Sequence, residues 1–280
     1  MSARPAPPPS PRRAPRREPF ERSRDYVESL ARGLVVLRSI GTLGGTATVA
    51  DLASRTRLSR AAVRRLVLTL EHLGYLQSAG RGYALTPRIL EFGHGFLGAA
   101  SLSDLAQPCM QRLAERIQES CSMAVLDRRD VVYVARVAVR KVMTVSLSVG
   151  ARLPAYCTSM GRVLLSGLDR EALDSWFEDC VPVPRTERTV TDVARLREIV
   201  ATVQREGYAW VEQELEMGLC SLAVPLRDRA GNVVAALNSG MPYRSAARAR
   251  AVGELLPALK ATAAEIERVM PTAWLTPVHS

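Results

Sequence analysis

Apolar residues recur at helical spacing between Thr48 and Leu85, and the pattern predicts two helices followed by a hairpin. Thr48 and Ser59 are suitable N-caps for a short helix from Val49 and for a longer one that ends near Gly74. Alternating apolar residues at 75–77 and 83–85 then predict two short strands around a glycine-containing turn. The longer helix should bury one apolar stripe, Val63, Leu66, Val67, Leu70 and Leu73.

Two more helical patterns surround this segment. Residues 25–43 should form a helix whose inward face carries Leu30, Leu34, Leu37 and Ile40, packed on the other two helices. Residues 87–100 should form a linker helix that begins at Pro87 and is unusually apolar. A linker with that much apolar surface predicts a neighbouring subunit as its partner, and so a homodimer or tetramer.

From Cys121 onward the pattern changes from helical spacing to strand alternation. The runs 121–128, 130–139 and 142–149 predict an antiparallel meander, with a preceding helix over 101–118. Helices near 159–168, 171–178 and 192–206, strands near 208–211, 221–228 and 233–240, and a final helix over 245–269 complete the pattern. The sequence therefore predicts an α+β domain in which helices flank an antiparallel sheet.

The order of elements and the composition together predict four segments. Residues 1–22 are rich in Arg and Pro and should form a disordered arm, because such a segment buries too little apolar surface to order itself. Residues 23–86 should form a winged helix-turn-helix, 87–100 the linker helix, and 101–275 the second domain.

Positive charge is concentrated in the first third of the chain. Residues 1–98 carry a net charge of +9 out of the total +10, whereas residues 99–280 are nearly neutral at +1. That asymmetry favours nucleic acid as a partner, since the major groove admits one helix with a basic ridge. An ordinary helical hairpin with solvated arginines is the alternative. The predicted contacts to double-stranded operator DNA are Thr48, Ser59, Arg60, Ala61, Arg64, Arg65 and, at the hairpin tip, Arg81.

Catalysis and metal binding have little support in the second domain. The three histidines are His72, His94 and His279, so residues 99–278 contain no histidine to serve as a general base or ligand. We therefore expect no enzyme activity, no metal and no cofactor. A purely architectural DNA binder is also disfavoured, because it would not need a near-neutral second domain of this size.

The remaining composition bears on the cellular compartment. No apolar run approaches the roughly 20 residues that span a bilayer, and no secretory signal is visible, so we expect no membrane association. Five scattered cysteines indicate reduced thiols and a cytoplasmic protein.

With these segments placed, the chain resembles an IclR-type transcriptional regulator from Asp25 to Met270. Three stretches carry the resemblance, LSRAAVRRLVLTLEHLGYL, LPAYCTSMGRVLLSGL and GYAWVEQELEMGLCSLAVPLRDRAGNVVAALN. The second stretch, with VVYVARV and MTVSLSVG before it, resembles the branch that controls aromatic-acid breakdown through the β-ketoadipate pathway. The resemblance implies a GAF-like effector domain, a dimer of dimers, and protocatechuate, 4-hydroxybenzoate or β-ketoadipate as effector. A regulator of another small organic acid, such as a glyoxylate-like, pyruvate-like or sugar-acid effector, is the alternative.

Candidate effector contacts come from the residues and from the resemblance. Thr158 should cap a helix whose first amides, at Ser159, Met160 and Gly161, form a seat for a carboxylate. Arg136 lies within an apolar strand and either binds an anion or faces solvent, while Tyr156, Met143 and Trp210 are candidate apolar walls. The resemblance adds Ser221, which takes the place of a family cysteine, and Asn238, which takes the place of a family serine.

Overall fold

The computed structural model describes residues 23–43, 45–92, 102–139 and 147–270, in two compact units divided after Phe96. The predicted arm (1–22), most of the predicted linker helix and the first half of the third predicted β-run lie outside the described residues.

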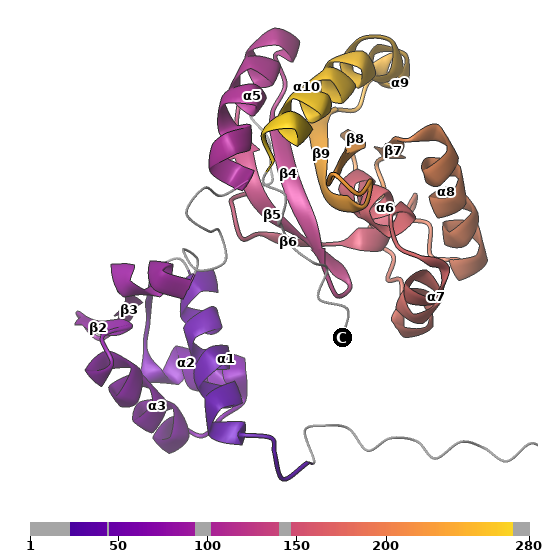
Figure 1. The fold of residues 1–280 in the computed structure, drawn as a ribbon. Helices are drawn as coiled ribbons and strands as arrows, with labels where there is room; N and C mark the ends of the chain where they lie inside the picture. The colour runs from indigo at the N-terminus through magenta and orange to yellow at the C-terminus, as the bar shows by residue number, and fades with distance from the viewer. Residues whose placement is uncertain (1–22, 44, 93–101, 140–146, 271–280) are drawn as a thin grey trace, which may run out of the picture. The chain divides into compact units, whose positions relative to one another are not determined.

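The N-terminal unit is a winged helix-turn-helix, as predicted (Figure 1). Its three-stranded sheet has the order β1-β3-β2, and the antiparallel pair β2–β3 is the predicted hairpin. The strand β1 was not predicted; it adds Thr46 and Ala47 to the edge of β3. The elements are α1 (Glu28–Thr42), β1 (Thr46–Ala47), α2 (Val49–Thr56), α3 (Arg60–His72), β2 (Leu76–Ala79), β3 (Gly82–Leu85) and the 3-10 turn η2 (Pro87–Ile89).

Local side-chain chemistry sets the helix boundaries in this unit. Thr48 and Asp51 form a capping box at the start of α2, and the Ser59 hydroxyl accepts the Ala62 N–H at the start of α3. Arg57, in the turn between the helices, has a left-handed backbone with φ 58°. Gly74 follows α3 with φ 80°, a conformation that glycine adopts without strain.

The predicted inward face of α1 is only partly right: of its four residues, Ile40 is fully buried and Leu37 packs against the core, but the other two are exposed. The helix packs on α2 and α3 through Val36 and Ile40, while Leu30 and Leu34 are 63% and 52% exposed. Two apolar stripes run along α1, and periodicity alone could not decide which stripe meets the core. Leu73, predicted to be inward on α3, is also exposed, because it is the C-cap residue where the chain leaves the helix.

The C-terminal unit is the predicted α+β fold, with a six-stranded antiparallel sheet of order β6-β5-β4-β9-β8-β7. Its final helix runs through a π-helical segment that the sequence did not reveal. The elements are α5 (Leu102–Ile117), β4 (Cys121–Asp127), β5 (Asp130–Val137), β6 (Arg152–Pro154), η3 (Ala155–Cys157), α6 (Ser159–Ser166), α7 (Arg170–Asp179), α8 (Val193–Glu206), β7 (Ala209–Glu212), β8 (Leu219–Arg227), β9 (Val233–Pro242), α9 (Ala247–Arg250), the π segment η4 (Ala251–Leu255) and α10 (Leu256–Val269).

Helices cover both faces of this sheet, so the unit has two hydrophobic cores (Figure 1). The α5 and α10 helices pack on one face, where Met110, Leu222 and Leu259 are fully buried. The α6, α7 and α8 helices cover the other face, where Val163 and Trp176 contribute to the second core. The edge strand paired with β5 is β6, whereas residues 147–149, the described end of the third predicted run, are not in a strand.

Candidate nucleic-acid interface and effector cavity

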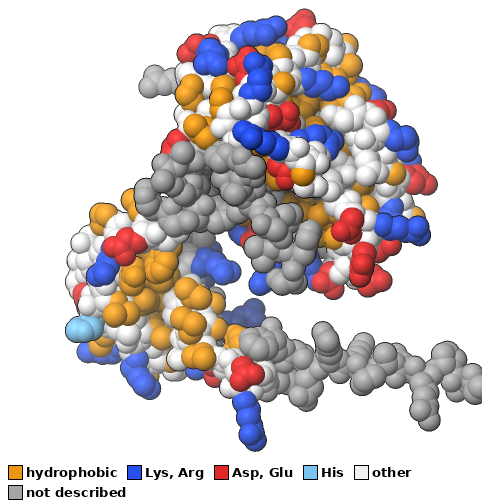
Figure 2. Space-filling model, viewed as in Figure 1, with side chains coloured by type: hydrophobic (Ala, Val, Ile, Leu, Met, Phe, Trp, Pro, Cys, Tyr) orange, Lys and Arg blue, Asp and Glu red, His pale blue; other side chains and the backbone are white. Residues whose placement is uncertain are grey.

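The exposed ridge of α3 carries the predicted DNA-reading residues. Arg60, Ala61, Arg64 and Arg65 are all exposed, and Arg81 is exposed in the turn between β2 and β3. Among the described residues, no carboxylate forms an ion pair with any of these four arginines, so their charge is available to phosphates or bases. Figure 2 shows arginine side chains, in blue, standing out along the margin of the N-terminal unit, which contains no lysine.

Thr48 and Ser59 hold the helix starts of this interface. The Thr48 hydroxyl accepts the Asp51 N–H at 3.2 Å and donates to the Asp51 carboxylate at 2.7 Å, which lowers the pKa of that carboxyl. Because its hydroxyl and its N–H are both occupied by Asp51, Thr48 positions α2 and has no free side-chain donor for DNA. Arg57, exposed between the two helices and not anticipated from the sequence, adds another basic group at the same turn.

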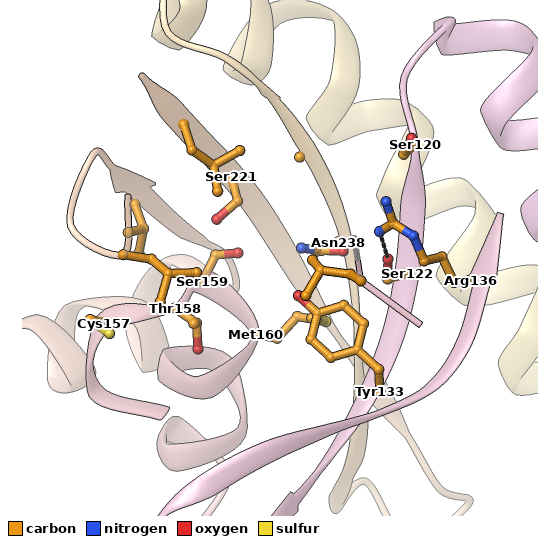
Figure 3. Close-up of a pocket in the computed structure, with 15 residues that line it drawn as sticks. Ser120, Ser122, Tyr133, Arg136, Cys157, Thr158, Ser159, Met160, Ser221 and Asn238 are labelled. Atoms are coloured by element: carbon orange, nitrogen blue, oxygen red, sulfur yellow. Dashed lines mark hydrogen bonds between the residues drawn. The ribbon is translucent and has the colours of Figure 1, made fainter. Parts of the chain in front are cut away.

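A cavity of about 40 Å³ lies between the sheet of the C-terminal unit and the start of α6 (Figure 3). It exists because small side chains on three central strands face α6 at neighbouring register positions. Ser122 of β4 pairs with Asn238 of β9, and Ser221 of β8 pairs with Gly240 of β9. Two residues away on each of these strands, on the same face of the sheet, the side chain is an alanine that packs directly against the helices. These alanines are Ala124, Ala223 and Ala236.

A β-bulge brings two further residues of β5 into this cavity. Tyr133 pairs with Ala124 and Ala135 pairs with Met123, so the register shifts at this point and Val134 has no opposite residue. Without the shift, strand alternation would place Tyr133 and Arg136 on opposite faces of the sheet. The bulge turns both side chains toward α6, where Figure 3 shows them together.

Arg136 is the one charged side chain among the described residues that line the cavity. Its Nη1 donates to the Ser122 hydroxyl at 3.0 Å, and no described carboxylate forms an ion pair with it. Burial raises the pKa of Tyr133 to about 12, although the nearby Arg136 charge opposes that shift, and burial raises the pKa of Cys157 to about 11. Both groups therefore stay neutral at neutral pH, and the cavity has a net positive charge suited to an anion.

Two buried polar side chains in the cavity have unmatched atoms. Ser159 is 1% exposed and Asn238 is 8% exposed, yet neither Ser159 Oγ nor Asn238 Oδ1 has a hydrogen-bond partner. Leaving a buried polar atom unpaired typically costs about 1–3 kcal/mol. Such atoms are usually paired, so these two indicate a ligand or bound water that supplies the missing hydrogen bonds.

The start of α6 differs from the predicted carboxylate seat. The Thr158 hydroxyl accepts the Gly161 N–H at 3.2 Å, so this amide is not available to a ligand. Gly161 lies outside the cavity, and a Cβ there would be 2.1 Å from the Ala155 carbonyl oxygen. Glycine is therefore required for close packing of α6 on η3, and only the amides of Ser159 and Met160 remain as candidates.

The predicted apolar walls are also different in the structure. Tyr156 does not line the cavity: its hydroxyl donates to the Val183 carbonyl oxygen at 2.6 Å, and its ring belongs to the core. Trp210 packs against the core on the opposite face of the sheet, and Met143 lies outside the described residues. Lining residues that were not predicted include Ser120, Ser122, Tyr133, Leu215 and Leu219.

The described part of the chain contains neither a cluster of metal ligands nor a helix that could span a membrane. No cluster of three or more His, Cys, Asp or Glu side chains there could hold a metal ion. No described helix combines the length and apolar character needed to cross a membrane.

Comparison with known proteins identifies the family. Residues 29–80 match the IclR helix-turn-helix domain, and residues 94–268 match the C-terminal domain of bacterial transcriptional regulators of the IclR type. The chain is 40% identical over 266 residues to the Pca regulon regulatory protein of Pseudomonas putida, covering 95% of this chain and 91% of that protein. It is 35% identical to the p-hydroxybenzoate hydroxylase transcriptional activator of Acinetobacter baylyi, covering 89% of this chain and 94% of that one.

Solved structures agree with the sequence relatives. A putative transcriptional regulator from Rhodococcus sp. RHA1 superposes with a TM-score of 0.74 at 44% identity, over 87% of this chain and 98% of that chain. An IclR homolog from Microbacterium hydrocarbonoxydans, complexed with 4-hydroxybenzoate, gives a TM-score of 0.75 at 27% identity, over 86% and 98%. The chain described here therefore belongs to the IclR family of bacterial transcriptional regulators.

Proposed function

We propose that this regulator binds a palindromic operator through the α3 ridge and responds to a small aromatic or dicarboxylic acid of the β-ketoadipate pathway. The observation that carries the effector assignment is the cavity itself. It combines one cation that has no carboxylate partner among the described residues, Arg136, with two buried and unpaired polar groups, Asn238 and Ser159.

These groups suit a ligand that is polar at both ends. One carboxylate of the ligand pairs with Arg136 and accepts from Ser122, because a partly buried guanidinium in an apolar cavity favours an anion. The other polar end is a phenolic hydroxyl or a second carboxylate. It reaches the Asn238 amide, the Ser159 hydroxyl and the free amides at the start of α6.

The relatives support the same class of ligand. The similar proteins include regulators named for the Pca regulon and for p-hydroxybenzoate hydroxylase. One similar structure holds 4-hydroxybenzoate, and another is described as an inducer-binding domain with 3-hydroxybenzoic acid. Because the cavity of this chain keeps a cation beside neutral donors, it can bind the carboxylate and the hydroxyl of such acids.

Cavity size adds a condition to this proposal. A cavity that admits benzene has a volume of about 150 Å³, whereas the one described here has about 40 Å³. Binding of an aromatic ring therefore requires the lining side chains to move apart, and the affinity includes the free energy of that rearrangement.

Calorimetry on the full chain with protocatechuate, 4-hydroxybenzoate and β-ketoadipate tests the proposal. We expect one of the three to bind, and Met160→Pro to weaken it, because proline removes a first-turn amide that has no partner within the helix. Binding of none of the three, together with binding of pyruvate, glyoxylate or a sugar acid, would replace the pathway assignment with the alternative one. Unchanged affinity in Met160→Pro would remove the α6 amides from the site.

We also expect the protein to form a homodimer or tetramer in solution. Hydrophobic side chains gather on the face of the N-terminal unit seen in Figure 2. Leu30 and Leu34 on α1, and Val27 at its N-cap, are each more than half exposed, as are Leu90 and Phe92 after the wing. Exposed apolar surface of this kind marks an interaction site, and a symmetric dimer would match a palindromic operator.

Light scattering at micromolar concentration measures the assembly. Leu30→Glu together with Leu34→Glu should shift it toward the monomer, because the substitutions put charge on the exposed stripe and leave Val36 and Ile40 in the core. An exposed pair on α8, Arg195→Glu with Glu198→Arg, is the control and should leave the mass unchanged. A strictly monomeric wild-type protein would contradict the assembly.

A further inference from the structure

One wall of the effector cavity is the connection between β7 and β8, residues 213–218. Leu215 within the connection and Leu219 just after it line the cavity. The Gln213 N–H donates to the Leu219 carbonyl oxygen at 2.8 Å, and the Gly218 N–H donates to Gln213 Oε1 at 3.0 Å. Gln213 is buried and has φ 58°, a left-handed conformation that a non-glycine residue keeps only where its surroundings hold it.

A buried ion pair ties this connection to α6. Arg162 Nη2 donates to Glu214 Oε2 at 2.7 Å, and the two side chains are 3% and 9% exposed. Arg162 lies in the first turn of α6, the turn that brings Ser159 and Met160 to the cavity. Its Nε also donates to the Tyr156 carbonyl oxygen at 3.1 Å, which fixes the guanidinium from the other side.

The remaining hydrogen bonds of Glu214 fix the connection to the segment before α8. The Val190 N–H donates to Glu214 Oε2 at 3.1 Å, and the Thr189 hydroxyl donates to the Glu214 carbonyl oxygen at 2.6 Å. The Thr186 hydroxyl donates to the Gln213 carbonyl oxygen at 2.7 Å. The connection is therefore held by side chains that lie outside the cavity, and neither Arg162 nor Glu214 lines it.

General energetics argue that such a pair is not present for stability alone. Removing two charges from water costs free energy, and the attraction between the charges often only balances that cost. A buried ion pair can, however, favour one geometry of the chain over the others. Here the pair joins two of the elements that line the cavity, α6 and the β7–β8 connection. Their separation decides how much space a ligand has.

We propose that Arg162 and Glu214 are positioning residues that hold the β7–β8 connection against α6 and thereby set the affinity of the effector cavity. The part of this inference that concerns effector affinity rests on the proposed function. The part that concerns the position of the connection does not depend on which effector binds.

Two substitutions of Glu214 in the full-length protein test the proposal. Glu214→Gln keeps an oxygen for Arg162 and Val190 but removes the charge. Glu214→Asp keeps the charge but is one methylene shorter, so it cannot reach both partners from the present backbone position. The control is Glu198→Gln, which removes a carboxylate from an exposed pair with Arg195 on α8.

Hydrogen exchange and calorimetry supply two separate readouts. In both Glu214 variants, exchange of the amides of residues 213–219 should be faster by about tenfold or more, with wild-type protection in α5 and α10. The dissociation constant for whichever of the three acids binds the wild-type protein should rise about tenfold. Glu198→Gln should match the wild type in both measurements.

Specific outcomes would overturn the proposal. Wild-type exchange at 213–219 in both variants would show that the pair does not position the connection. A uniform loss of protection across both faces of the sheet would show a general structural role instead. If no acid binds the wild-type protein, the proposed effector class fails, and the exchange result alone still decides the positioning role.

Discussion

Loss of both Arg64 and Arg65 is expected to abolish operator recognition while the protein remains folded. Each arginine that reads a base contributes about 1–3 kcal/mol, so the double alanine variant should lose about 2–6 kcal/mol if the two act independently. Both side chains are exposed on α3 and lie off the apolar stripe that buries Val63 and Val67. Alanine favours helix at these positions, so the fold should be unaffected.

The measurement is fluorescence anisotropy with an operator selected from random DNA by the wild-type protein, at fixed salt. The matched control is Arg195→Ala with Arg205→Ala on α8, which removes the same two charges from the C-terminal unit. If the control weakens binding as much as the α3 variant does, general charge and not the ridge drives binding. The salt dependence of binding in the two single variants then separates the roles of the arginines. Loss of a phosphate contact lowers the slope by about one, whereas loss of a base contact changes the sequence preference.

The helix boundaries could be predicted because their signals are local. Thr48, Ser59 and Thr158 each cap the helix that follows, as their positions in the sequence indicated. The face of α1 could be predicted in this way only in part, because Ile40 and Leu37 face the core and Leu30 and Leu34 do not. Its choice between the Leu30 stripe and the Val36 stripe depends on where α2 and α3 pack, which is a tertiary property.

The cavity shows the same division between local and distant signals. Ser159, Met160, Ser221, Asn238 and Arg136 were named from the sequence and from the family resemblance, and the structure brings these five together. Tyr133 was missed because strict strand alternation places it opposite Arg136, and only the bulge at Val134 puts both on one face. A bulge depends on pairing between two strands and leaves no clear pattern in one of them.

Gly161 has a different role from the predicted one. The sequence predicted its amide as part of a carboxylate seat, whereas in the structure it lies outside the cavity and allows close packing on the Ala155 carbonyl oxygen. The Arg162–Glu214 pair had no sequence signal, because its partners are 52 residues apart and each resembles an ordinary surface charge. Burial, which only the fold reveals, distinguishes them.

Arg136→Ala is expected to weaken effector binding by roughly tenfold to over a hundredfold, with little change in operator affinity when no effector is present. A hydrogen bond to a charged group typically contributes about 1.5–3 kcal/mol, and Arg136 is the cavity's one charged lining residue among those described. Its side chain donates to Ser122 and pairs with no acidic group in the described ranges, so its removal leaves no carboxylate there without a partner. Calorimetry on the full chain measures the loss, with Arg129→Ala, an exposed arginine in the turn before β5, as the control.

A neutral ligand distinguishes a direct contact from an effect on cavity shape. If 4-hydroxybenzoate binds the wild-type protein, 4-hydroxybenzamide should bind more weakly, because it lacks the charge that pairs with Arg136. Arg136→Ala should then bind the amide about as well as the wild-type protein does, since the interaction that the substitution removes is already absent. A loss of similar size for the amide would contradict the pairing of carboxylate and guanidinium. In that case Arg136 would act through Ser122 and the packing of β4 against β5, and the positive charge of the cavity would not explain its preference for acids.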